Sequence, residues 1–403
     1  MLQLGQRSES VRRANLSAIV RALHAAGPLS RSELVARTGL TRTAIRDLVG
    51  ELVSAGLASE GSSEPLGTPG RPSRVVRLDA CAAQVLALEI AVDSLAAARV
   101  GLGGDVLALQ RIDRPADHVS VDAIVEDLTG LADRIGARGP RLVGVGVAVV
   151  GIVRRADGFV ATAPNLRWRA APLGERLAAS LRVAAISVAN EADLGALAEH
   201  RRGAAVGVDD VLFISGEVGV GGGIIVDGVP LRGVAGYGGE VGHLPINPAG
   251  RRCRCGAIGC WETEIGEEWL LLAGGYPSDG GREAVDALLG DAAAGSERAR
   301  ASLDELGRWL GIGLAGLVNV FNPAVIVLGG RFGRLHEYVR PIVEAELDRR
   351  ALAAPRALVS IVPTRLGDDA PLIGAAELAF DPLLADPASW VSANGLHPAG
   401  AGA

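Results

Sequence analysis

Residues 239–262 read GEVGHLPINPAGRRCRCGAIGCWE and hold three of the four cysteines of the chain. The candidate ligands follow the spacing His-x9-Cys-x-Cys-x4-Cys; they are His243, Cys253, Cys255 and Cys260. Four soft or borderline ligands on a Gly-rich loop match a closed Cys₃His zinc site, which is structural because no coordination position stays open for water. The alternative is three free thiols beside a core histidine, but thiols this close together would be readily oxidised. The stretch therefore predicts zinc as a structural cofactor.

Length and composition indicate a multidomain globular protein. At ~150 residues per domain, 403 residues suffice for two or three domains, and 49% hydrophobic residues allow a sizeable core. No apolar run reaches the ~20 residues needed to cross a bilayer, and residues 1–7 lack the basic-then-apolar order of a secretory signal. We expect a cytoplasmic protein with no membrane partner. In a reducing compartment, crowded cysteines favour metal over disulfides.

Charge is distributed unevenly along the chain. Residues 1–80 contain 11 arginines against 7 acidic residues, and the remainder contains 29 against 39. A basic head on an acidic body is typical of a small nucleic-acid reader joined to a larger domain, although so modest an excess can also arise by chance. The chain has no lysine. A Walker-type nucleotide site, which requires Gly-Lys-Ser/Thr, is therefore excluded.

The first eighty residues predict a helix-turn-helix. Apolar spacing and capping signals indicate helices over residues 9–26, 31–38 and 41–54. The apolar stripe of the third helix leaves Arg42, Thr43 and Arg46 on its open face. Recognition helices place such N-terminal residues against base edges, so we expect these three to contact DNA. The alternative is a packing module with solvated arginines.

A wing is predicted to follow the third helix. Residues 56–59 and 73–78 have strand character, and the Gly- and Pro-rich segment 61–72 between them cannot be helical. The tripeptide Gly70-Arg71-Pro72 is narrow and extended, so Arg71 could enter an A·T-rich minor groove. An ordinary solvated hairpin tip would have the same composition.

The rest of the chain alternates strands with helices, which indicates α/β sheets covered on both faces. Strands are expected at 84–91, 96–101, 106–112, 141–149, 185–188, 211–215, 223–226, 324–328 and 357–362, and helices at 120–136, 191–204, 303–321, 334–351 and 374–379. The glycine-rich segment 216–223 suits a hairpin turn better than a phosphate loop. We divide the chain into residues 1–80, 81–380 and a Pro-, Ala- and Gly-rich tail, 381–403, that is expected to be loose.

These motifs resemble the ROK family (repressors, open reading frames, kinases). The matching residues are Gly239–His243, Cys253–Gly256 and Gly259–Glu262, and the resemblance extends over nearly the whole chain, including the winged helix and its Gly-Arg-Pro wing. It implies a two-lobed actin-like ATPase fold with a cleft between two α/β lobes. The family contains sugar kinases and sugar-sensing repressors, and an N-terminal winged helix-turn-helix is similar to the repressor branch.

The resemblance also implies a set of sugar-binding residues. The matching positions here are Asn165, Asn190, Glu240, His243 and Glu262. Their carboxylates, amides and imidazole can bind a ring of hydroxyls, and His243 could bind zinc with one nitrogen while the other faces the sugar. Without the family, Asn165 and Asn190 would be interpreted as loop or cap residues, and Asn190 also has the position of a helix N-cap.

Three departures from the family's kinases argue against catalysis. The kinases carry Asn-Asp, whereas this chain has Asn190-Glu191. The extra methylene displaces the carboxylate oxygens by more than about one ångström, and such a shift can cost ~100-fold in rate. The phosphate motif Asp-x-Gly-Gly-Thr is replaced by Glu89–Asp93, without the two glycines and with a carboxylate in place of the hydroxyl. Glu217 adds a negative charge in the second phosphate loop. Glu191 is thus a vestigial position, and we expect no catalytic residue and no ATP binding.

Together these features predict a sugar-responsive transcriptional repressor. A homodimer or tetramer would place two winged helices on a double-stranded operator, and a sugar between the lobes would change their arrangement. One alternative is an ATP-dependent sugar kinase of the glucokinase type with an appended DNA-binding head, in which Glu191 is the base. A ligand-independent DNA-binding scaffold is the other.

Overall fold

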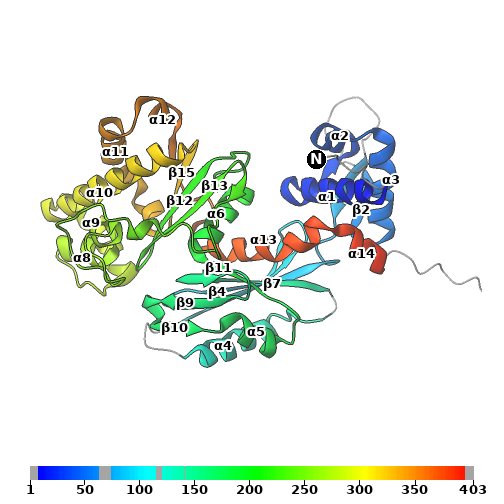
Figure 1. The fold of residues 1–403 in the computed structure, drawn as a ribbon, viewed down its shortest axis with the longest axis horizontal. Helices are drawn as coiled ribbons and strands as arrows, with labels where there is room; N and C mark the ends of the chain where they lie inside the picture. Colours follow the sequence, from blue (N-terminus) through cyan, green and yellow to red (C-terminus); the bar gives the residue numbers. More distant parts are fainter. Residues whose placement is uncertain (1–7, 63–73, 115–119, 140, 395–403) are drawn as a thin grey trace, which may run out of the picture.

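The computed structural model describes residues 8–62, 74–114, 120–139 and 141–394, and shows a small N-terminal domain beside two α/β lobes (Figure 1). This domain, the head, contains three helices and a small antiparallel sheet in the order β1-β3-β2. Its elements are α1 (Ser8–Ala26), β1 (Leu29–Ser30), α2 (Arg31–Thr38), α3 (Arg42–Ser54), β2 (Ala58–Ser62) and β3 (Arg74–Leu78). The predicted helices and the two strands of the wing are present, and the sequence missed only the short β1.

Local hydrogen bonds explain where the head's helices begin. The Glu33 backbone N–H donates to Ser30 Oγ at 3.2 Å, and Glu33 Oε2 accepts from the Ser30 backbone N–H at 2.7 Å. This is the predicted capping box. Thr41 Oγ1 accepts from the Ala44 N–H at 3.2 Å and starts α3. The tip of the predicted wing, including Arg71, lies outside the described residues.

The first lobe is a mixed sheet in the order β11-β7-β4-β5-β6. Alternate residues of β4 face opposite sides: Leu86 and Leu88 pack with α4 and α5, and Ala87 packs with α13. A smaller sheet, β10-β9-β8, adjoins it. The bounds are β4 (Gln84–Ile90), β5 (Ser94–Gly101), β6 (Val106–Asp113), α4 (Val121–Arg134), β7 (Leu142–Val149), β8 (Ile152–Arg154), β9 (Phe159–Ala163), β10 (Trp168–Ala171), α5 (Leu173–Leu181), β11 (Ser187–Asn190) and α13 (Ala370–Ala385).

The second lobe is a sheet in the order β14-β13-β12-β15-β16. Phe213 on one face packs with α6, and Leu212 on the other packs with α10 and α11. The segment around residues 216–220 is the expected hairpin between β12 and β13. The bounds are α6 (Glu191–Arg202), β12 (Val211–Gly216), β13 (Val220–Val226), β14 (Val229–Pro230), α7 (Trp261–Ile265), α8 (Glu267–Gly274), α9 (Gly281–Ala293), α10 (Glu297–Phe321), β15 (Val325–Gly329), α11 (Gly330–Arg350), α12 (Ala353–Leu358) and β16 (Ser360–Pro363).

Two helices, α6 and α13, pack against each other between the lobes (Figure 1). Glycines permit this close approach. A Cβ on Gly374 of α13 would lie 2.0 Å from the Leu194 carbonyl oxygen of α6, and one on Gly146 of β7 would lie 1.9 Å from the Ala375 carbonyl oxygen. Because these neighbours are backbone atoms, a larger residue would force the two helices, or helix and sheet, apart.

The expectation of a loose tail from residue 381 is wrong for the described part of it. Helix α13 continues to Ala385, and α14 (Pro387–Asn394) follows. Leu384 and Val391 are buried in the same apolar core as Leu16 of α1, so burial outweighs the Pro- and Ala-rich composition. Residues 395–403 lie outside the description. Among the described helices, none is both long and apolar enough to cross a membrane.

Candidate functional site

A cleft of about 760 Å³ lies between the two lobes. Its walls come from the end of β4 and the residues after it, from the hairpin that follows β12, and from the start of α11. Carboxyl ends of strands are where open α/β sheets place their ligands. Asn165, Glu191 and Glu217, three positions singled out from the sequence, line this cleft.

The four predicted metal ligands converge beside the cleft. Their donor atoms all lie within 4.8 Å of one another. Cys253 Sγ is 3.7 Å from His243 Nδ1, and Cys255 Sγ is 3.6 Å from Cys260 Sγ. In a tetrahedral site with metal–sulfur bonds of ~2.3 Å, neighbouring ligands lie roughly 3.8 Å apart. The four side chains could therefore hold one metal ion.

The loop that carries these ligands is shaped by its own backbone. Gly256 and Gly259 have φ angles of 99° and 73°, which side chains rarely allow. Isolated bridges pair Pro245 with Cys260 and Arg252 with Ile258, so the segment between them folds back on itself. The sequence's glycines thus bring ligands distant in the chain into one cluster.

His243 connects the metal cluster to the predicted sugar residues. Its Nδ1 faces Cys253, and its Nε2 lies 4.0 Å from Glu240 Oε2. Glu262 is adjacent: Oε1 lies 3.7 Å from Cys253 Sγ, and Oε2 accepts from the Val220 backbone N–H at 3.1 Å. Two nitrogens of one ring therefore face in different directions, as the dual role of His243 requires.

The two predicted asparagines lie in different environments. Asn165 lies in a 3-10 turn (Pro164–Leu166) and accepts a 3.0 Å hydrogen bond from Arg254. Since Arg254 belongs to the loop that carries the candidate metal ligands, this bond joins the first lobe to that loop. Asn190 is the N-cap of α6: its Oδ1 accepts from the Ala192 N–H at 2.7 Å, and its Nδ2 donates to the Gly151 carbonyl at 3.0 Å. The cap interpretation of Asn190 is confirmed, and its contact with sugar stays a prediction.

Glu191 occupies the start of α6 inside the cleft. Its Oε2 is buried without a hydrogen-bond partner among the described residues. Burial raises the pKa of Glu191 to about 8, and the nearby charges of Glu240 and Asp193 add to this effect. Burial likewise raises the pKa of Asp193 to about 7. At neutral pH Glu191 is thus largely protonated, and can donate a hydrogen bond to a hydroxyl.

This raised pKa predicts a pH-dependent effect of Glu191→Gln. Between the ordinary pKa of 4.5 and about 8, the folded protein keeps a proton that the unfolded chain releases, so Glu191 destabilises the fold increasingly as pH rises. Glutamine does not titrate. We expect the variant to melt roughly 2–4 °C above the wild type at pH 9, and close to it at pH 5, by calorimetry. A difference that is the same at both pH values would contradict the assignment.

The lining of the cleft also includes carboxylates and arginines that are already paired with carboxylates. Arg111 lies 3.0 Å from Glu89 and 3.0 Å from Asp369, and Arg282 pairs with Asp368. Burial raises the pKa of Glu89 and of Glu217 to about 7. Arginines with carboxylate partners are poorly placed to neutralise a triphosphate, since binding would have to displace these ion pairs.

The predicted DNA-reading residues lie together on an open surface. Arg42, Thr43 and Arg46 are exposed on the first turns of α3, while Ile45 and Leu48 on the opposite side are buried. Arg46 forms an exposed ion pair with its neighbour Asp47, which exchanges readily for another partner. The arrangement matches the one predicted from the apolar stripe.

Comparison with known proteins places the chain in a family. The profile of the ROK family matches residues 85–381, which is most of the chain. The chain belongs to the ROK family. The two-lobed body with a cleft, expected from the motif resemblance, is therefore the ROK fold.

ROK regulators match this chain along almost its entire length. The xylose repressor of Bacillus subtilis is 26% identical over 377 residues, which cover 93% of this chain and 97% of the repressor. A crystal structure of a ROK family transcriptional regulator, homologous to Escherichia coli Mlc, has a TM-score of 0.75 and 27% identity over 94% of this chain and 97% of its own. By contrast, the glucokinase of Streptomyces coelicolor is 30% identical over 315 residues, which cover 98% of the glucokinase but only 74% of this chain.

Two residues that line this cleft, Arg254 and Arg331, were not predicted from the sequence. The position of Arg254 could have been inferred, because it stands between the candidate ligands Cys253 and Cys255. Nothing in the local sequence indicates the role of Arg331. It is buried at the start of α11, where it donates to the Glu217 carbonyl oxygen and, at 3.0 Å, to the Glu267 carboxylate. These contacts depend on tertiary packing, not on spacing in the sequence.

Proposed function

We propose that the protein is a DNA-binding transcriptional repressor of the ROK family that responds to a sugar. The observation that carries this proposal is the full-length match to ROK repressors, head included, whereas the glucokinase match leaves about a quarter of the chain uncovered. The exposed first turns of α3 support the role of Arg42, Thr43 and Arg46 as base-contacting residues. Arg71, predicted to enter the minor groove, keeps that role as part of the proposal.

Zinc is the metal best suited to the cluster. Three thiolates and one imidazole are its preferred structural donor set, and a site filled by four protein ligands holds a loop in place without activating water. His243, Cys253, Cys255 and Cys260 would be the ligands. The bound ion would orient His243, and the loop would then fix Glu240 and Glu262 on the side of the cluster that faces the sugar.

The effector is proposed to be a monosaccharide, because the curated relatives are named for xylose and glucose. It would lie between the lobes, bound by Asn165, Asn190, Glu240, His243 and Glu262. Glu191 would serve as a further hydrogen-bonding group, protonated at neutral pH. The test is a gel shift with a duplex that the protein itself selects from a random-sequence library, with and without D-xylose or D-glucose. Sugar-independent affinity would contradict the proposal.

We expect the protein to lack sugar kinase activity. In a coupled assay for ADP release with D-xylose, D-glucose and other monosaccharides, turnover should stay far below the ~1–100 s⁻¹ typical of kinases. The substitution Glu191→Asp alone should not restore it, because Arg111 and Arg282 in the cleft are already paired with carboxylates and would have to leave them to bind a triphosphate. Turnover in the kinase range by the wild type would instead favour the appended-kinase alternative.

The proposed assembly is a homodimer or tetramer, since a two-fold arrangement of heads matches a roughly palindromic operator. Light scattering of the purified protein measures its mass in solution. A monomer that still binds one duplex with full affinity would oppose this part of the proposal.

A further inference from the structure

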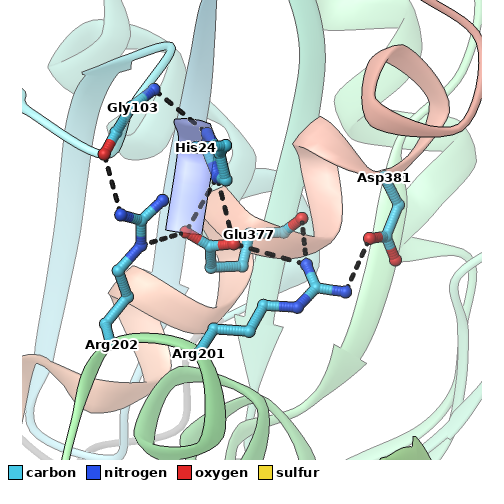
Figure 2. Close-up of polar contacts among 6 residues, drawn as sticks. All are labelled: His24, Gly103, Arg201, Arg202, Glu377 and Asp381. Atoms are coloured by element: carbon cyan, nitrogen blue, oxygen red, sulfur yellow. Dashed lines mark hydrogen bonds and ion pairs between the residues drawn. The ribbon is translucent and has the colours of Figure 1, made fainter. Parts of the chain in front are cut away.

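An ionic cluster built around the buried pair His24 and Glu377 joins the head to the body. His24 of α1 points at Glu377 of α13, and its Nε2 lies 3.2 Å from both carboxylate oxygens (Figure 2). Arg202, at the end of α6, donates to Glu377 at 2.7 Å, and Arg201 donates to it at 3.3 Å. Arg201 also binds Asp381, one turn further along α13, at 2.8 Å. We call these five side chains the joint.

The backbone of Gly103, in the turn between β5 and β6, closes the joint into a ring (Figure 2). Its N–H donates to His24 Nδ1 at 3.0 Å, and its carbonyl accepts from Arg202 at 2.8 Å. Because Nδ1 accepts a hydrogen bond, the proton of a neutral imidazole lies on Nε2, which donates to Glu377. The ring thus fixes the tautomer of His24 as well as its position.

Glu377 is the centre of the joint. Its side chain is 2% exposed, and that of His24 is 4% exposed. Burial by itself raises the pKa of Glu377, but the His24 hydrogen bond and the charges of Arg202 and Arg201 outweigh it and hold the pKa at about 2. A buried carboxylate depends strongly on its partners, so a shift of either arginine changes the interactions available to His24.

Helix α6 links the joint to the sugar cleft. Asn190 is the N-cap of this helix, Glu191 is its first residue, and Arg201 and Arg202 are its last two. At 1.5 Å per residue, its 12 residues span about 18 Å. Glu199, which is fully buried, ties the same end to the second lobe by accepting from the backbone N–H groups of Arg365 and Leu366 at 3.1 and 2.9 Å.

The joint is formed by elements of different lobes. Helix α6 packs on β12 and β13 of the second lobe, whereas α13 packs on β4 and β7 of the first. A change in lobe arrangement would therefore move Arg201 and Arg202 of α6 relative to Glu377 and Asp381 of α13. Packed helices rearrange in discrete steps, so such a shift would change the hydrogen bonds that Glu377 shares between the two arginines and His24.

We propose that α6 transmits sugar occupancy from the cleft to the DNA-binding head through the joint of His24, Arg201, Arg202, Glu377 and Asp381. This inference rests on the proposed function and adds the route by which its two sites communicate. The joint is a device for coupling and contributes no contact to sugar or DNA. A variant of the joint should therefore still bind sugar and still bind DNA, but sugar should no longer change the affinity for DNA.

The experiment measures this coupling in the full-length protein. The coupling factor is the ratio of duplex Kd values with and without saturating D-xylose or D-glucose, using the library-selected duplex. A wild-type factor of about 5–150 is typical of allosteric proteins, and Arg202→Gln should reduce it to below about 3 while duplex and sugar each still bind. His24→Ala should act alike, and the double variant should lose no more than either single one, since both lie on one route.

Arg13→Gln is the matched control. Arg13 also anchors α1 to the body, through Asp386 and Ser389, but these partners belong to the α13–α14 region and not to α6. The control should keep the wild-type coupling factor. Metal content and melting temperature identify misfolded variants. If Arg202→Gln does not fold, the more exposed Arg201→Gln replaces it.

The outcomes separate the two proposals. If the wild type shows no effect of either sugar on duplex binding, the proposed function fails and this inference with it. If the wild type couples and folded Arg202→Gln and His24→Ala couple equally well, the route through the joint is wrong and the proposed function stands. If Arg13→Gln loses coupling to the same extent, general docking of the head, and not α6, carries the signal.

Discussion

Cys255→Ser is expected to release the metal and abolish the response to sugar. Structural zinc in small peptides supplies ~10–16 kcal/mol of apparent binding free energy, and a hydroxyl is a far weaker ligand than a thiolate. Cys255 lies 3.6 Å from Cys260 in the cluster, so its loss leaves three ligands for the ion. The loop would then no longer fix His243, whose Nδ1 faces the same cluster.

Three measurements check this expectation: zinc per chain by atomic absorption, sugar-induced change in duplex Kd, and melting temperature. We expect less than one tenth of the wild-type metal and a coupling factor near 1. The control is Cys81→Ser, because Cys81 is exposed and lies outside the cluster, so both quantities should stay at wild-type values. A Cys255→Ser protein with full zinc and normal sugar response would refute the assignment.

Arg46→Ala is expected to cause the largest loss in DNA binding. A bidentate contact between arginine and guanine contributes ~1–3 kcal/mol of discrimination, which corresponds to roughly 5–150-fold in Kd for the selected duplex. Affinity for an unrelated duplex should fall much less, because backbone contacts remain. Gel shifts at fixed salt concentration measure both values, and their ratio reports the specificity.

Arg21→Ala is the matched control for Arg46→Ala. Arg21 is an exposed arginine of the same domain, but it lies on α1 and binds Ser17 of its own helix. Its removal changes net charge equally, so it should leave the specificity ratio unchanged. Equal losses in the two variants would mean that charge alone, and not the face of α3, accounts for the effect.

Features set by neighbours in sequence were predictable. The capping box at Ser30 and Glu33 needs only a four-residue pattern, and both of its hydrogen bonds are present. The convergence of the four candidate metal ligands needs only a spacing that allows a short loop to close, and the glycines at 256 and 259 supply the required backbone. The N-cap role of Asn190 likewise follows from the helix that starts after it.

Features set by distant packing were not predictable. The interaction of His24 with Glu377 spans 353 positions, and nothing local to either residue indicates it. The tail was misjudged for the same reason: its composition suggests a loose segment, but Leu384 and Val391 find an apolar partner in α1. Strands β8–β10 were also not predicted.

The shared apolar core of head and body has a consequence for how such a protein can diversify. Leu16 and Leu23 of α1 are buried together with Phe380 and Leu384 near the end of the chain, 350 or more positions away. A new DNA-reading head therefore cannot be exchanged as a free unit. Only a head whose first helix packs against the C-terminal helices α13 and α14 would fold onto this body. The first and last segments of the chain must therefore change together during evolution.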